Sequence, residues 1–154
     1  TKCDGVKLEG GKKIIQYVKT LVKHNIPVMG HIGVLPQSDK TFKFKGKKKS
    51  EKEKIIRDAK LLEEAGAISI VLECIETSLA KQVTKSINVP TIGIGASNNC
   101  DGQILVFDDL IGLNLINVRF VKKYTNIKKE ISKAVSKYSS EVKARKFPSK
   151  KYSY

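Results

Sequence analysis

The chain has 154 residues, 40% of them hydrophobic, which is enough for one domain with its own core. The net charge is +15, but the lysines are scattered and only three of the 30 basic residues are arginines, so solvated lysine faces explain the charge better than a nucleic-acid site. No apolar run approaches the ~20 residues of a membrane span, and three cysteines without CxxC spacing indicate neither a disulfide framework nor a zinc site. We therefore expect a cytoplasmic protein without membrane or nucleic-acid partners.

Five short apolar runs alternate with helix-length segments along the chain. A parallel strand that is buried on both faces reads as such a continuous apolar run, so the alternation predicts βα units. The expected strands are residues 5–8, 27–32, 68–73, 91–95 and 103–107.

Helical segments are expected between and after these strands. A capping box, Ser50 with Glu53, is predicted to start the second helix, and Gly66 is predicted to end it. A long loop is expected over residues 34–49, and a frayed basic tail over 144–154. The expected helices are residues 12–25, 50–65, 78–87, 119–124 and 127–143.

The number of units limits the choice of architecture. Five units at roughly 30 residues each are complete, but an eight-stranded βα barrel needs about 250 residues. The chain, expected to be a single domain over 1–154, is then either an open five-stranded sheet or part of a barrel. A fragment is the simpler interpretation, because only five residues precede Val6.

Polar residues follow several of the expected strands, where parallel α/β folds place their ligands. Glu73 directly follows the apolar run Ile70–Leu72, and we expect apolar surroundings to raise its pKa toward the range of a general base. A helix N-cap or a lysine partner is the alternative role for this carboxylate.

Lys7 and Glu9 lie two residues apart at the end of the first strand, so their side chains share a face. An ammonium beside a carboxylate suits an oxyanion anchor next to a Mg²⁺ ligand, and a simple ion pair is the alternative. His31 is a further candidate, as a hydrogen-bond donor at the rim of a pocket or as a structural histidine.

Several motifs together resemble a known family, the ketopantoate hydroxymethyltransferases. They occur in the family's order and at its spacing over nearly the whole chain. The motifs are VKLEGG (residues 6–11), PVMGHIG (27–33) with PQS (36–38), IVLE (70–73), PTIGIGA (90–96), CDGQILV (100–106) and FP (147–148).

The resemblance implies a (β/α)₈ TIM barrel, of which this chain would be the C-terminal five βα units, an incomplete barrel. It implies a Mg²⁺-dependent homo-oligomer that transfers a hydroxymethyl group from 5,10-methylenetetrahydrofolate to 3-methyl-2-oxobutanoate, giving 2-dehydropantoate in pantothenate biosynthesis. Carried over residue by residue, Glu73 matches the general base, Glu9 a Mg²⁺ ligand and Lys7 a residue that binds the keto acid.

The chain also departs from the family pattern. Two aspartates on the family's first strands, which complete its metal and substrate site, have no counterpart here, and Glu76 stands where the family has proline. We therefore expect residues 1–154 alone to be inactive. The alternative hypothesis is a catalytically inactive remnant that acts as an oligomerisation or interaction module.

Overall fold

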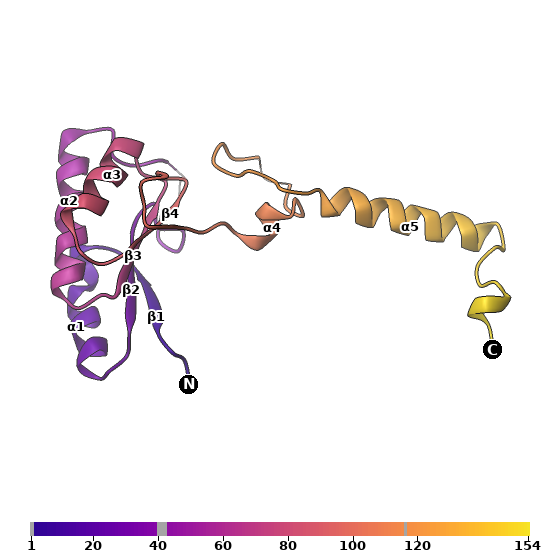
Figure 1. The fold of residues 1–154 in the computed structure, drawn as a ribbon, viewed down its shortest axis with the longest axis horizontal. Coiled ribbons are helices and arrows are strands. Elements are labelled where there is room, and N and C mark those ends of the chain that lie inside the picture. Colours follow the sequence, from indigo (N-terminus) through magenta and orange to yellow (C-terminus); the bar gives the residue numbers. More distant parts are fainter. Residues whose placement is uncertain (1, 40–42, 116) are drawn as a thin grey trace. The chain divides into compact units, whose positions relative to one another are not determined.

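The computed structural model describes residues 2–39, 43–115 and 117–154, so part of the expected 34–49 loop lies outside the described residues. The chain divides into two compact units, residues 1–104 and 105–154. The first unit contains the sheet and its covering helices, and the second contains the long helix α5 (Figure 1). The expectation of a single domain stays a prediction.

The first unit is built on one parallel five-stranded sheet, as the apolar runs predict. The strands are β1 (Val6–Glu9), β2 (Val28–Gly33), β3 (Ser69–Glu73), β4 (Thr91–Ile94) and β5 (Gly102–Gln103). Their order in the sheet follows their order in the chain, and every neighbouring pair is parallel. The fifth strand is shorter than predicted, because β4 ends at Ile94 and helix α4 (Phe107–Leu110) begins where the apolar run ends.

Three helices cover one face of this sheet: α1 (Ile15–Lys23), α2 (Lys49–Glu64) and α3 (Thr77–Ser86) (Figure 1). A 3-10 turn, η1 (Lys12–Ile14), precedes α1. Alternate strand residues face the helices and form one core with them. The strand residues in or against this core are Val6 and Leu8 of β1, Val28 and Ile32 of β2, and Ile70 and Leu72 of β3.

The start of α2 differs from the predicted capping box. The helix begins one residue earlier, at Lys49, and its N-cap residue Lys48 makes no side-chain cap hydrogen bond. Glu51 accepts hydrogen bonds from the backbone N–H groups of Gly46 and Lys47 instead, at 2.7 and 3.2 Å. A carboxylate in the first turn therefore secures the preceding loop, and Gly66 follows the end of the helix as predicted.

The second unit contains α4, α5 (Ile127–Lys143) and a 3-10 turn, η2 (Lys150–Tyr152). The predicted helix over residues 119–124 is wrong. The segment forms a single turn in which the N–H of Val121 donates to the carbonyl of Val118, and the N–H of Tyr124 donates to the carbonyl of Leu110, outside the segment, at 2.8 Å. In the tail, the Phe147 ring packs edge-on against Tyr138. Of the described residues, none belongs to a helix long and apolar enough to span a membrane.

Glu76 acts as the N-cap of α3. Its carboxylate accepts hydrogen bonds from the backbone N–H groups of Ser78 and Leu79, at 3.0 and 3.1 Å, and from the Ser78 hydroxyl. The Ser78 hydroxyl contributes most to lowering the pKa of Glu76, from 4.5 to about 2, followed by the Ser78 backbone N–H. These bonds hold two N–H groups that the helix itself cannot pair.

We predict that Glu76→Gln lowers the free energy of unfolding by about 1 kcal/mol near neutral pH, the usual cost of losing an N-cap. Because the pKa of the carboxyl group is lower in the folded state, its stabilisation is present above pH 4.5 and is lost as the pH falls toward 2. Urea denaturation of both proteins across this range measures the difference, which should shrink with acidification. A difference independent of pH would contradict a charged cap.

Candidate functional site

The face of the sheet opposite the helices carries the residues singled out in the sequence. Side chains alternate along each strand, so Lys7, Glu9, His31 and Glu73 lie on the other side from the core residues. The register pairs Glu9 with His31. It pairs Glu73 with Gly33, two residues beyond His31 on β2. The predicted gathering at the carboxyl ends of β1, β2 and β3 is therefore present in the structure.

Glu9, His31 and Glu73 form a buried group, which we call the carboxylate–histidine cluster. The His31 side chain is 1% exposed, and the side chains of Glu9 and Glu73 are 6% and 10% exposed. His31 Nε2 lies 3.2 Å from Glu73 Oε2, and Nδ1 lies 3.9 Å from Glu9 Oε1. The imidazole ring of His31 therefore lies between the two carboxylates.

Backbone groups fix two members of the cluster. The other oxygen of Glu9, Oε2, accepts a hydrogen bond from the backbone N–H of Gln37 at 3.0 Å. His31 Nε2 lies 3.0 Å from the carbonyl oxygen of Val34, while the N–H of Val34 donates to the carbonyl of Glu73 at 2.9 Å. The segment that follows β2 therefore returns over the cluster and contacts all three strands.

The turns after β2 and β3 have restricted backbones. Gly33 has φ +104°, and a side chain there would overlap the carbonyl oxygen of Glu73, so only glycine allows the two strand ends to approach this closely. Cys74, directly after Glu73, has φ +47°, an uncommon value for a residue with a side chain. Burial, and then the charge of Glu73, raise the pKa of the Cys74 thiol to about 11, so it stays protonated at neutral pH.

Lys7 stands apart from the cluster. Its side chain is exposed, and among the described residues it makes no ion pair with Glu9, so the simple ion-pair interpretation of this pair is wrong. Glu73 likewise is not an N-cap, because Glu76 caps the following helix. The Lys7 ammonium, exposed on the same face of the sheet, is available to bind an anionic group.

The described residues do not complete a metal site by themselves. No three side chains of the His, Cys, Asp or Glu type within 2–39, 43–115 and 117–154 are arranged to hold an ion. Glu9 Oε1 lies 3.9 Å from His31 Nδ1, too far for a hydrogen bond, so this oxygen can serve as one ligand. The chemistry fits Mg²⁺, which binds through one or two carboxylates and keeps water or substrate in its shell.

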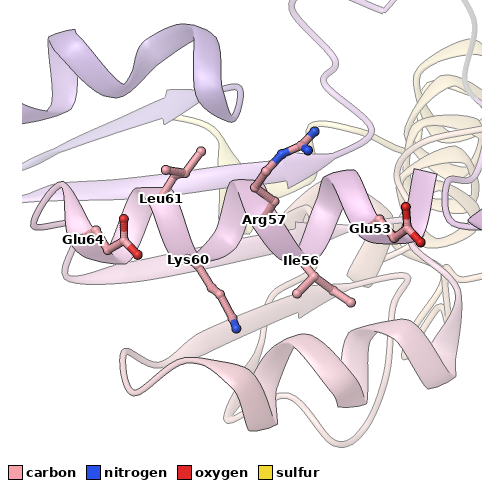
Figure 2. A pocket seen from close by; sticks show the side chains of 6 residues that line it. All are labelled: Glu53, Ile56, Arg57, Lys60, Leu61 and Glu64. Carbon is pink, nitrogen blue, oxygen red and sulfur yellow. The ribbon is translucent and has the colours of Figure 1, made fainter. Parts of the chain in front are cut away.

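Hollows elsewhere on the first unit contain none of Lys7, Glu9 and Glu73. One, of about 370 Å³, lies on the surface of α2 (Figure 2). Another, of about 260 Å³, lies between the end of β2 and α2, with Ile32, Ile55 and Asp58 in its wall. The cluster is therefore distinct from both.

Asp58 supports the site but was not among the predicted residues. It lies on α2, is 2% exposed, and its carboxylate accepts hydrogen bonds from the backbone N–H of Lys12 at 3.1 Å and from Lys54 Nζ at 2.6 Å. It therefore anchors the turn that follows Glu9. The sequence does contain a signal for this role, because Asp58 is a charged residue at a core-facing position in the apolar stripe of α2.

The architecture and the cluster define a class: a parallel α/β protein with a polar cluster at the carboxyl ends of its strands. A sequence model of the family described as ketopantoate hydroxymethyltransferase matches residues 1–150. The chain belongs to this family.

Individual relatives agree with the family match. A Pelagibacter ubique protein named 3-methyl-2-oxobutanoate hydroxymethyltransferase is 65% identical over 154 residues, which is 100% of this chain and 60% of that protein. Proteins of the same name from Clostridium botulinum (strain Langeland) and Chlorobaculum parvum are 50% and 47% identical, over 97% and 99% of this chain and 56% and 57% of their own length. The chain thus spans less than two thirds of the length of these relatives.

We predict that Gly11→Ala destabilises the fold and disturbs the end of β1. A methyl group at this position would overlap the carboxylate of Asp58, which must move and release the N–H of Lys12. Overpacking of this kind costs about 1–3 kcal/mol. Gly102→Ala is the control, because its methyl group would meet only the end of the Ile92 side chain, at 2.9 Å. Urea denaturation compares the two, and equal losses would remove the Gly11–Asp58 contact as the cause.

Proposed function

We propose that this chain supplies part of the active site of a 3-methyl-2-oxobutanoate hydroxymethyltransferase. The reaction moves a hydroxymethyl group from 5,10-methylenetetrahydrofolate to 3-methyl-2-oxobutanoate and gives 2-dehydropantoate, in pantothenate biosynthesis. The observation that carries the proposal is the carboxylate–histidine cluster at the carboxyl ends of β1 to β3. The family match and the names of the relatives support it.

We propose further that the sheet is the C-terminal five-unit part of a (β/α)₈ barrel. Two features support this architecture over a doubly wound sheet: the strands follow in sequential order, and α1 to α3 cover the same face. A doubly wound sheet reverses its strand order and carries helices on both faces. In a closed barrel, β1 and β5, at the edges of the described sheet, would pair with the remaining strands.

Glu73 is proposed as the general base. A keto acid is acidic at the carbon next to the ketone, and removing the C3 proton of 3-methyl-2-oxobutanoate generates the nucleophilic carbon that accepts the one-carbon unit. Oε1 of Glu73 has no hydrogen bond within the described part of the chain, so it is the oxygen available for that proton. Lys7, exposed on the same face, would hold the carboxylate of the substrate.

Glu9 is proposed as one Mg²⁺ ligand, through Oε1, while its Oε2 stays bonded to the N–H of Gln37. When bound, Mg²⁺ would stabilise negative charge on the ketone oxygen as the proton leaves. The further ligands would come from residues outside this chain, which accords with the absence of a three-ligand cluster among the described residues. A homo-oligomer stays a prediction.

An inactive module that only mediates interactions is the alternative. A test needs a completed chain, which we define as residues 1–154 joined to the part of the Pelagibacter ubique relative that lies outside the match. If the completed chain forms no 2-dehydropantoate from the two substrates with Mg²⁺, the module is favoured. Residues 1–154 alone serve as the second arm and are expected to be inactive.

We predict that Glu73→Gln in the completed chain abolishes exchange of the C3 proton of 3-methyl-2-oxobutanoate, because the amide cannot accept it. Binding of the keto acid should change little, since the substitution preserves size. Proton NMR in deuterated water measures the exchange. Glu64→Gln, on the exposed surface of α2 (Figure 2), is the matched control and should exchange at the wild-type rate. Exchange in Glu73→Gln at that same rate would exclude Glu73 as the base.

We predict that Glu9→Gln weakens Mg²⁺ binding by the completed chain, because a charged oxygen ligand becomes a neutral one. Keto-acid binding should weaken only when Mg²⁺ is present. Calorimetric titration of Mg²⁺ measures the affinity, again with Glu64→Gln as the control. Equal affinities for Glu9→Gln and the wild type would show that Glu9 has no part in metal binding.

A further inference from the structure

His31 is the most deeply buried polar side chain of the carboxylate–histidine cluster, at 1% exposure. It lies near the end of β2, beside Glu9 in the register, and its ring reaches both carboxylates. Its Nδ1 is buried and has no hydrogen-bond partner among the described residues.

The surroundings of Nε2 assign its proton. This nitrogen lies 3.0 Å from the carbonyl oxygen of Val34 and 3.2 Å from Glu73 Oε2. A carbonyl oxygen and a carboxylate oxygen both accept hydrogen bonds. An unprotonated Nε2 would therefore direct its lone pair at the lone pairs of two oxygens, which is repulsive. Nε2 therefore carries the proton.

Val34 connects His31 to the end of β3. Its carbonyl oxygen accepts the hydrogen bond from His31 Nε2, and its own N–H donates to the backbone carbonyl of Glu73. The imidazole is thereby tied to the same strand end that carries the Glu73 carboxylate. The positive end of the N–H dipole then attracts Oε2 and leaves Oε1 as the oxygen free of such a contact.

We propose that His31 is a positioning residue for Glu73: its Nε2–H, which is bonded to the Val34 carbonyl, attracts Oε2 from 3.2 Å and so directs Oε1 to the substrate. This inference rests on the proposed function. His31 does not touch the reacting atoms and transfers no proton. A carboxylate held in one orientation reacts faster than one that samples several, because the geometry of proton transfer is already set.

The test compares three substitutions in the completed chain. His31→Leu removes the donor at similar volume, His31→Asn places an amide near the Nδ1 position, and His31→Gln extends an amide N–H to the Nε2 position. We expect His31→Leu and His31→Asn to lower kcat for C3 proton exchange about 10- to 100-fold, with the keto-acid KM changed less than about 3-fold. His31→Gln should restore most of kcat.

Equal kcat for His31→Leu and the wild type would overturn the proposal, as would a loss confined to KM, or His31→Gln as slow as His31→Leu. A wild-type completed chain that exchanges no C3 proton would instead overturn the proposed function.

A measurement on the wild-type completed chain keeps the proposal testable if the Leu variant fails to fold. Nitrogen-15 NMR of histidine-labelled protein reports which ring nitrogen carries the proton. His31 and His24 differ in surroundings, since His24 is exposed and its Nδ1 lies 2.8 Å from the Thr20 carbonyl oxygen. We expect a protonated Nε2 for His31, with a signal that moves in Glu73→Gln. An unprotonated Nε2, or a signal unchanged by Glu73→Gln, would overturn the proposal.

Discussion

The packing of helices against only one face of the sheet determines where the candidate site of this protein lies. Alternate residues of β1, β2 and β3 enter the apolar core with α1 to α3, so their neighbours must point the other way. Those neighbours include Glu9, His31 and Glu73, and parallel pairing brings them to one end of the sheet. The ionisable groups of the cluster are thereby kept out of that core, where an unpaired charge would be costly.

Sequence reasoning located the strands and the candidate residues because both signals are local. A continuous apolar run marks a strand, and a polar residue at its end marks the site edge. It did not reveal which side chains meet, because this depends on register: Glu9 lies beside His31, whereas Lys7 lies beside Met29 and remains exposed. Two other contacts are long-range, and no local pattern encodes them. They are the hydrogen bond from the Gln37 N–H to Glu9 and the close approach of the Asp58 carboxylate to Gly11.

The errors of prediction have the same origin. Ser50 and Glu53 fit a capping box, yet the loop before α2 takes Glu51 as its partner and the helix begins at Lys49. Residues 119–124 have enough apolar character for a helical turn, but the N–H of Tyr124 bonds to the carbonyl of Leu110, outside the segment. Where a segment is long and periodic, as in α5 over Ile127–Lys143, the predicted and observed ends coincide.

The raised pKa of Cys74 has a practical consequence for studying this protein. At neutral pH only about one Cys74 thiol in ten thousand would be ionised, and the thiolate is the form that reacts with alkylating agents. Cys100 is buried as well, whereas Cys3 is exposed, three residues before β1. A fluorescent or spin label attached through maleimide chemistry should therefore mark Cys3 selectively, and would report on the edge strand without disturbing the cluster.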